Sequence, residues 1–402
     1  MMTKIYQKKV PICFGWFIIL AMFPQVIGFN GSTVDMLFKF ILIIGLTFLV
    51  INRAYLTKVS KYFCFFLMTS FTGVVGTLIC NGTEIFTEIQ SWIIALLLLY
   101  VLYESVLHVR DIKLKDIISF YKIFVYFMTV AAIYNTIVHF NSLLHITSLN
   151  VYNTDSICSF FDNKNTYGVF LLFGTLAAII LKIVLQQQRW AVVAVLFVIN
   201  ELMAMCRTAI ILSVILIAVA FVVDRKTRFQ GIISLILLLG VIIIFVKQNE
   251  SVNYFFTNTL FGNSKSLDAR NDYVTSMLPL ARGGQFWFGY GNSNATQLAT
   301  EYTGNAYYHN TYLKCLISGG IIKLVLQISA IVLSIRYGVK NRFYNKMIGN
   351  LCLLSTFIYI TYAFVESVVL FDTPVVAIMA VVFIISMPIL YYNALVGEKY
   401  LN

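Results

Sequence analysis

Long apolar segments follow one another along most of this chain, and they constrain its fold more than any other feature. A helix crosses the roughly 30 Å hydrocarbon core of a bilayer with about 20 apolar residues. Hydrophobic residues make up 60% of the chain and charged residues 11%, far from the composition of soluble domains. Segments near the required length lie at residues 10–29, 34–51, 62–80, 91–107, 117–138, 167–185, 190–206, 208–223, 231–246, 311–335, 347–371 and 374–393. The sequence therefore predicts an all-α polytopic integral membrane protein with about twelve transmembrane helices.

The lysine and arginine residues predict which side of the membrane each connection faces, because cytoplasmic loops are enriched in both. Lys4, Lys8 and Lys9 place the N-terminus in the cytoplasm, and basic clusters recur at alternate connections, for example at Arg225 and Lys226. We expect residues 10–29 to remain as an uncleaved first helix, because no small-x-small cleavage site follows. An even number of helices returns the C-terminus to the cytoplasm. The predicted regions are 1–246 with helices 1–9, a large extracytoplasmic loop over 247–310, and 311–402 with helices 10–12.

Composition also limits the classes of ligand. The formal net charge of +12 follows from the cytoplasmic clusters and suits anionic lipid, and no basic patch or motif points to nucleic acid. The sequence has no Walker loop, dinucleotide fingerprint or paired metal ligands, so we expect no cofactor and no metal. The seven cysteines are expected to be buried thiols, although Cys80, Cys158 and Cys206 lie near the outer face, where they could be oxidised.

The predicted loop contains signs of ordered structure. Ser266-Leu267-Asp268 resembles a helix start, and the pattern continues to about Leu278 before Pro279 stops it and Gly283-Gly284 provides a break. Arg270 falls within the apolar stripe of this short amphipathic helix, where it either contacts an anion or extends to lipid phosphates. The aromatic run 285–291 is typical of an interfacial belt, and stacking on a sugar is the alternative.

Several ionisable residues lie within the apolar segments, where charge is unfavourable. Glu104, Lys39 and Lys122 are near helix ends, from which their side chains can extend to the interface. Five others are expected at one depth near the outer face, and they are Glu201, Arg207, His309, Lys314 and Glu366. They predict a polar cavity that opens outward, and a salt-bridged structural cluster is the alternative.

His309 and Arg207 carry the chemistry that such a cavity allows. A neutral imidazole beside fixed cations can act as general base for a hydroxyl, or His309 can simply cap the next helix at Asn310-Thr311. Arg207 lies in the short hinge Cys206-Arg207-Thr208. Its guanidinium suits a lipid-linked phosphate or diphosphate, and pairing with Glu201 is the alternative.

In its architecture and in four short motifs, the chain resembles the O-antigen polymerase and ligase family of bacterial envelope glycosyltransferases. Members of that family are bundles of about ten to fourteen helices with a large external loop late in the chain. The motifs are Phe161-Asp162-Asn163-Lys164-Asn165, Cys206-Arg207-Thr208, the Arg270 loop helix, and Gly289-Tyr290-Gly291 followed by His309-Asn310 and Gly320. Cys206 replaces the usual serine, and Lys323 lies three positions after Gly320, where the family often has a small residue.

The resemblance implies transfer of a glycan from an undecaprenyl-diphosphate donor at the outer face of the bacterial cytoplasmic membrane. His309 would activate the acceptor hydroxyl, and Arg207 and Arg270 would hold the departing diphosphate. The residues expected to contact substrate are Asn310, Glu366, Glu201, Arg282, Asn165 and Lys164. The expected partners are the carrier-linked oligosaccharide and membrane lipid, and a chain-length regulator is a candidate.

Three functions remain open at this point. A polysaccharide polymerase and an O-antigen ligase share the donor and differ in the acceptor, and we favour the polymerase. A flippase or other transporter would also have about twelve helices, but it would need polar groups near the midplane and a repeat of two halves, and neither is visible in the sequence.

Overall fold

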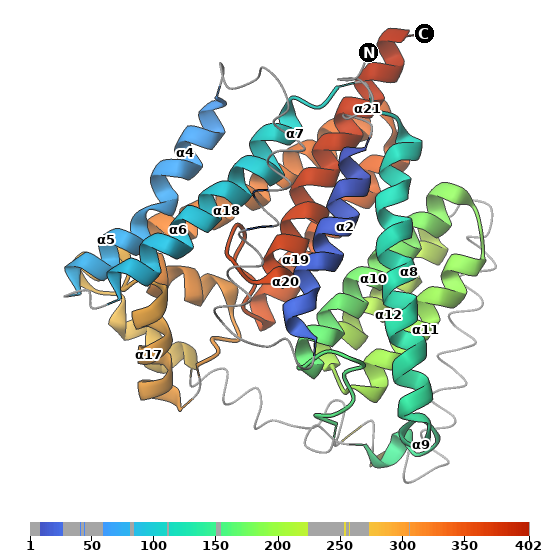
Figure 1. Ribbon diagram of the computed structural model, residues 1–402, viewed down its shortest axis with the longest axis horizontal. Coiled ribbons are helices and arrows are strands. Elements are labelled where there is room, and N and C mark those ends of the chain that lie inside the picture. The colour runs from blue at the N-terminus through green and yellow to red at the C-terminus, as the bar shows by residue number, and fades with distance from the viewer. Residues whose placement is uncertain are drawn as a thin grey trace. The chain divides into compact units, whose positions relative to one another are not determined.

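The computed structural model describes residues 9–26, 59–80, 84–110, 112–149, 154–223, 273–304 and 306–401, together with the isolated residues 41, 44, 253, 254 and 257. Every regular element in these ranges is a helix, as Figure 1 shows, apart from one isolated antiparallel bridge between Val26 and Phe161. The predicted all-helical class is therefore confirmed.

Within the described residues, seven helical segments are long and apolar enough to cross a membrane. They are Lys61–Ile79, Ile85–Leu107, Leu114–Val138, Lys164–Leu185, Thr311–Tyr344, Lys346–Val365 and Val375–Gly397. Two shorter apolar helices are Val10–Gln25 and Arg207–Val219. The predicted spans at 231–246 and, apart from two isolated residues, at 34–51 lie outside the described residues. The total of twelve helices therefore stays a prediction.

The chain divides into two compact units. Unit 1 comprises Met1–Ala21, Asp35–Phe120 and Asp268–Asn402, and unit 2 comprises Met22–Val34 and Tyr121–Leu267. The N-terminal helix α2 (Val10–Met22) and helix α8 (Leu114–Val138) each have residues in both.

Unit 1 is organised around the long helix α18 (Thr311–Tyr344), which contacts elements from both ends of the chain. Its neighbours are α4 (Lys61–Ser70), α5 (Thr72–Ile79), η5 (Leu278–Leu280), α16 (Gly283–Phe288), α17 (Asn292–Thr303), α19 (Lys346–Val365), η6 (Val382–Ser386) and α21 (Met387–Leu401). Helix α6 (Ile85–Leu99) continues through the π-helical turn η2 (Tyr100–Glu104) into α7 (Ser105–Leu107), and α20 (Val375–Val381) continues into η6.

Side chains of η6 and α21 bond to backbone carbonyls of η2, of α7 and of the residue Val109 that follows it. Ser386 Oγ donates to the Leu102 carbonyl at 2.6 Å, and Asn393 Nδ2 donates to the carbonyls of Val106 and Val109 at 3.1 and 2.9 Å. These bonds connect η6 and α21 to the α6–α7 segment through polar groups that have partners within the protein, as an apolar interior requires.

Helix α18 is interrupted at Gly320, whose φ of 68° and ψ of −169° are not helical. The amides of Tyr290 and Gly291 donate to the carbonyls of Ile317 and Ser318 at 2.8 and 2.9 Å, so the break is filled by the loop between α16 and α17. A Cβ at Gly320 would overlap the carbonyl oxygen of Trp287. Glycine is required there both for its backbone conformation and for the close approach.

Unit 2 contains α9 (Phe140–Leu144), η3 (Ile146–Ser148), α10 (Lys164–Leu185), α11 (Arg189–Met203) and α12 (Arg207–Val223), with most of α8. Helices α10, α11 and α12 pack on one another and form the green bundle in Figure 1. Asn200 of α11 links this bundle to α8, because its Oδ1 accepts from Asn135 Nδ2 at 2.8 Å. The same oxygen accepts from the Tyr167 hydroxyl of α10 at 3.2 Å.

Three expectations about local structure were wrong. The predicted break at Gly283-Gly284 is instead the start of α16, and a second helix, α17, follows after three residues. Helix α19 ends at Val365, so residues 366–371 are not helical although their apolar composition predicted a continuous span. Glu104 does not extend to the interface, because its carboxylate is buried and accepts from Ser60 N and Oγ at 2.9 and 2.7 Å. Of the predicted loop helix, residues 273–277 are helical and the part before them lies outside the described residues.

Candidate functional site

His309 lies directly before α18, in a conformation that few residues other than glycine adopt. Its φ is 46°, and Asn310 after it is the N-cap, with Oδ1 accepting from Leu313 N at 2.9 Å. Asn310 Nδ2 donates to the Phe364 carbonyl at the end of α19 at 3.2 Å. Asn310, and not His309, therefore caps the helix. Positive φ in a non-glycine residue is unfavourable and persists where the surrounding structure holds it, which is common at functional sites.

The imidazole of His309 faces a carboxylate. Nδ1 lies 3.5 Å from Glu366 Oε2, and the side chains of His309 and Glu366 are 29% and 23% exposed. The Nδ1 atom itself is buried, so the exposed part of the His309 side chain belongs to its other atoms. Tyr273 lies edge-on to the ring with centroids 6.3 Å apart. A carboxylate at Nδ1 favours a proton on that nitrogen and leaves Nε2 as a base.

A second ion pair lies five residues further along α18. Lys314 Nζ is 3.5 Å from Asp372 Oδ2, and Asp372 Oδ1 accepts from Thr373 N at 2.9 Å. Burial raises the pKa of Asp372, but the positive charges of Lys314 and Lys323 outweigh it, so its pKa lies below the ordinary value. Asp372 is therefore an ionised hydrogen-bond acceptor at neutral pH.

Residues 366–374 connect these two pairs as a non-helical segment between α19 and α20. Thr311 Oγ1 donates to the Glu366 carbonyl at 2.7 Å and accepts from Val368 N at 2.8 Å. Further along, Leu370 N donates to Gln327 Oε1 at 3.0 Å. Irregular backbone within an apolar bundle is tolerated where protein groups satisfy it. Side chains of α18 therefore fix the position of the Glu366 carboxylate beside His309.

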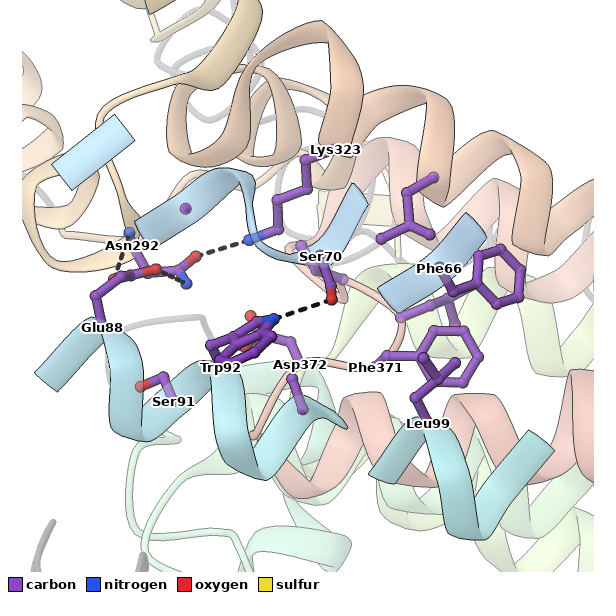
Figure 2. A pocket seen from close by; sticks show the side chains of 15 residues that line it. Phe66, Ser70, Glu88, Ser91, Trp92, Leu99, Asn292, Lys323, Phe371 and Asp372 are labelled. Carbon is purple, nitrogen blue, oxygen red and sulfur yellow. Dashed lines mark hydrogen bonds between the residues drawn. The ribbon is translucent and has the colours of Figure 1, made fainter. Parts of the chain in front are cut away.

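Another polar cluster of unit 1 was missed by sequence reasoning (Figure 2). Both Glu88 carboxylate oxygens accept from Asn292, Oε2 from the backbone amide at 2.9 Å and Oε1 from Nδ2 at 2.8 Å. Lys323 Nζ donates to Asn292 Oδ1 at 2.8 Å and to Ser318 Oγ at 3.1 Å. A glutamate in the first turn of an apolar helix and a lysine within α18 were the available signals, but their partner Asn292 is distant in sequence.

The remaining predicted residues of unit 1 are less constrained. Arg282 is exposed, and its carbonyl accepts from Phe286 N at 3.3 Å in the first turn of α16. Arg270 lies outside the described residues. In the part of the chain that the structure describes, no group of three His, Cys, Asp or Glu side chains could hold a metal ion.

The other predicted residues belong to unit 2. Arg207 is the half-buried first residue of α12, and the hinge before it includes Met205 with a φ of 54°. Glu201 is fully buried near the end of α11, and its Oε1 accepts from Ser213 Oγ at 2.8 Å. A buried carboxyl group without any partner is strongly unfavourable. The bond from Ser213 gives Glu201 such a partner and connects its carboxyl group to α12.

Lys164 and Asn165 begin α10 and have structural partners. Lys164 Nζ lies 2.6 Å from Asp155 Oδ1, and its carbonyl accepts from Cys206 Sγ at 3.1 Å. Asn165 is exposed, and its amide donates to the N-cap Asn163 at 2.8 Å. Of the predicted polar residues described here, His309, Asn310, Glu366, Lys314 and Arg282 belong to unit 1, and Arg207, Glu201, Lys164 and Asn165 belong to unit 2.

The fold defines a multi-pass membrane protein. Residues 192–328 match the family model described as O-antigen ligase, and this region contains Arg207, His309 and Lys323. The match covers about a third of the chain and confirms the expected resemblance to the O-antigen polymerase and ligase family. A search of curated proteins gives no match.

Proposed function

We propose that the chain is a membrane glycosyltransferase that polymerises a surface polysaccharide of O-antigen, capsule or exopolysaccharide type. It transfers a glycan from an undecaprenyl-diphosphate carrier to a carrier-linked repeat unit on the outer face of the cytoplasmic membrane. The observation that carries this proposal is the His309–Glu366 pair, with Nδ1 3.5 Å from the carboxylate. The family match over residues 192–328 supports the class of reaction.

In this mechanism His309 acts as the general base. Its Nε2 takes the proton of the acceptor hydroxyl as that oxygen bonds to the anomeric carbon of the donor sugar. The bond from the anomeric carbon to the diphosphate oxygen breaks, and its electron pair leaves with the carrier diphosphate. Glu366 holds the imidazole and stabilises the positive charge that it gains, as the acid of a catalytic triad does.

Arginines would stabilise the leaving group. A departing diphosphate gains negative charge, which a planar guanidinium can bind through two parallel hydrogen bonds. Arg207 and Arg270 are the residues that we propose for this role, because the family resemblance assigns it to them. The reaction as proposed needs no metal ion.

A ligase is the second candidate, since the matching family model carries that description. It would use the same base and the same donor and would transfer the finished glycan to a different acceptor. The two candidates differ in the product that accumulates when the protein is missing.

Deletion of the gene distinguishes them when surface glycan and carrier-linked glycan are both analysed. Surface glycan shortened to single repeats would establish the polymerase, and long polymer retained on the carrier would establish the ligase. Repeats trapped on the cytoplasmic face would instead identify a flippase. Unchanged glycan in all fractions would refute the proposal.

Complementation then tests the base. His309→Ala should fail to restore the glycan, whereas His145→Ala should restore it, because His145 is exposed and its ring bonds only to the Asn141 carbonyl in its own turn. Equal amounts of both variants in the membrane are the control. Full restoration by His309→Ala would exclude this residue as the base.

A further inference from the structure

The Glu88–Asn292–Lys323 cluster forms one end of a pocket in unit 1. In Figure 2, Glu88 and Asn292 lie at one end, Lys323, Trp92 and Ser70 lie between, and Phe66, Leu99 and Phe371 lie at the other end. Asp372 also lines the pocket. Pockets that bind small ligands combine apolar and aromatic walls with a few oriented polar groups, and this one has both.

Lys323 has binding capacity left after its contacts with the protein. An ammonium group has three N–H donors, and two of them are used by Asn292 Oδ1 and Ser318 Oγ. Both acceptors are neutral oxygens. The third N–H is therefore available to a ligand in the pocket, although the positive charge of Lys323 also acts on Asp372.

The acidic side chains of the pocket have different amounts of capacity. Both oxygens of Glu88 are occupied by Asn292, so this carboxylate mainly fixes the cluster. Asp372 is ionised and pairs with Lys314 at 3.5 Å, a distance longer than a strong charge-assisted hydrogen bond. A carboxylate has about four lone-pair positions, so Asp372 can also accept from a hydroxyl.

The aromatic walls are held in place. Trp92 Nε1 donates to Ser70 Oγ at 3.2 Å, and Phe71 packs against the indole with centroids 5.0 Å apart. Phe371 has a φ of 61°, which is unfavourable for an aromatic residue, and its ring packs on Phe66 at 5.7 Å. Backbone strain of this kind persists where neighbouring groups fix it, so the pocket is formed before a ligand enters.

The same backbone segment connects this pocket to the candidate base. Glu366 contacts His309, and Asp372 lines the pocket. Six residues of extended chain span at most about 20 Å, so the two sites are close on the scale of an oligosaccharide. A ligand in the pocket would therefore lie near the reacting hydroxyl.

We infer that this pocket binds a sugar ring of the glycan substrate, and that Lys323 selects it through a hydrogen bond to a hydroxyl or carboxylate substituent. A sugar ring has hydroxyl groups at its edge for Lys323 and Asp372 and a C–H face for Trp92. The inference rests on the proposed function for the identity of the glycan. It does not depend on His309 being the base.

Binding of glycan to the purified full chain tests the pocket separately from catalysis. The probe is the carrier-free repeat unit released by mild acid from the surface glycan of the source strain, titrated in detergent by calorimetry. Lys323→Met should weaken binding by about tenfold or more, as expected when one hydrogen bond to a charged group is lost. Lys115→Met is the matched control, because Lys115 is exposed at the start of α8.

A second variant avoids the polar cluster, whose disruption could affect folding. Ala95 lines the pocket from α6, and Ala95→Leu should reduce binding by filling space while every bond of Lys323 remains. Unchanged thermal unfolding is required of both variants. Binding by Lys323→Met and Ala95→Leu at the wild-type affinity would overturn the inference.

Three further results separate the hypotheses. His309→Ala should retain glycan binding and lose transfer. If gene deletion leaves the surface glycan unchanged while Lys323-dependent binding persists, the proposed function is refuted and the sugar-binding pocket is retained. Vesicles of phosphatidylglycerol test the alternative ligand, an anionic lipid headgroup. Lys323-dependent binding of that lipid without binding of the repeat unit would overturn the sugar pocket.

Discussion

Substitution of Gly320 by alanine should destabilise unit 1 far more than the same substitution at Gly304. Both glycines have a positive φ, 68° and 70°, but Gly304 is in the left-handed helical region with a ψ of 6°, whereas Gly320 has a ψ of −169°, a region that is almost restricted to glycine. A Cβ at Gly304 meets nothing within 4 Å, whereas at Gly320 it overlaps the Trp287 carbonyl. Gly304→Ala therefore measures the strain of a left-handed helical position without a clash, about 1 kcal/mol.

The cost at Gly320 includes the contact between α16 and α18. Relief of the overlap requires the α16 end to move away, which breaks the bonds from Tyr290 N and Gly291 N to α18. Each bond contributes about 0.5–1.5 kcal/mol net, and a non-glycine residue in the backbone conformation of Gly320 costs about 1–3 kcal/mol, so the free energy of unfolding should fall by about 2–6 kcal/mol.

Thiol exposure during heating measures this difference. Cys315 and Cys352 are buried in α18 and α19, and a Cys64→Ser background removes the exposed thiol that would react at once. Reaction with a fluorogenic maleimide should begin at a clearly lower temperature in Gly320→Ala than in Gly304→Ala. Hydrogen exchange at the amides of Tyr290 and Gly291 should accelerate only in Gly320→Ala. Equal onset temperatures in the two variants, with unchanged hydrogen exchange at Tyr290 and Gly291, would refute the reasoning.

Four further predictions concern the polar groups. Glu366→Gln should lower the rate of transfer about tenfold or more with little effect on acceptor KM, and a changed KM alone would argue against its role beside His309. Arg207→Lys should lose transfer although charge is retained, and full activity would exclude bidentate contact with diphosphate. Chelators should leave transfer by the purified protein unchanged, whereas a strict requirement for a divalent ion would refute the metal-independent mechanism. The lowered pKa of Asp372 contributes stability that is complete above its ordinary value of 3.8 and is lost as the pH falls through the lower folded value. The midpoint temperature of thermal unfolding should therefore fall less in acid for Asp372→Asn than for the wild type. Parallel curves of midpoint temperature against pH would contradict this.

The sequence predicted the helices well where apolar length and polar caps coincide. Asn163 and Asn310 cap α10 and α18, and both starts lie within three residues of the predicted spans. The sequence predicted His309 and Glu366 at one depth together with three other ionisable residues, and it did not predict that these two would pair across 57 positions.

Other features depend on contacts that a sequence does not display. Apolar composition indicates burial and does not specify conformation, so residues 366–371 were assigned to a helix although Thr311 and Gln327 bind their backbone. The Glu88–Asn292–Lys323 cluster joins α6, α17 and α18, and it becomes visible only when these helices are known to be neighbours. The start of α16 was missed because two glycines were taken as a break.

The segment 366–374 is synthesised after the residues that satisfy its backbone. Its backbone is satisfied by Thr311 and Gln327 of α18, which leave the ribosome before the segment does. The translocon would therefore release this polar backbone next to partners that already occupy the bilayer. A circular permutation that placed α18 after the segment would expose those amides and carbonyls to lipid during insertion, and such a chain should be degraded even though its final contacts could be the same.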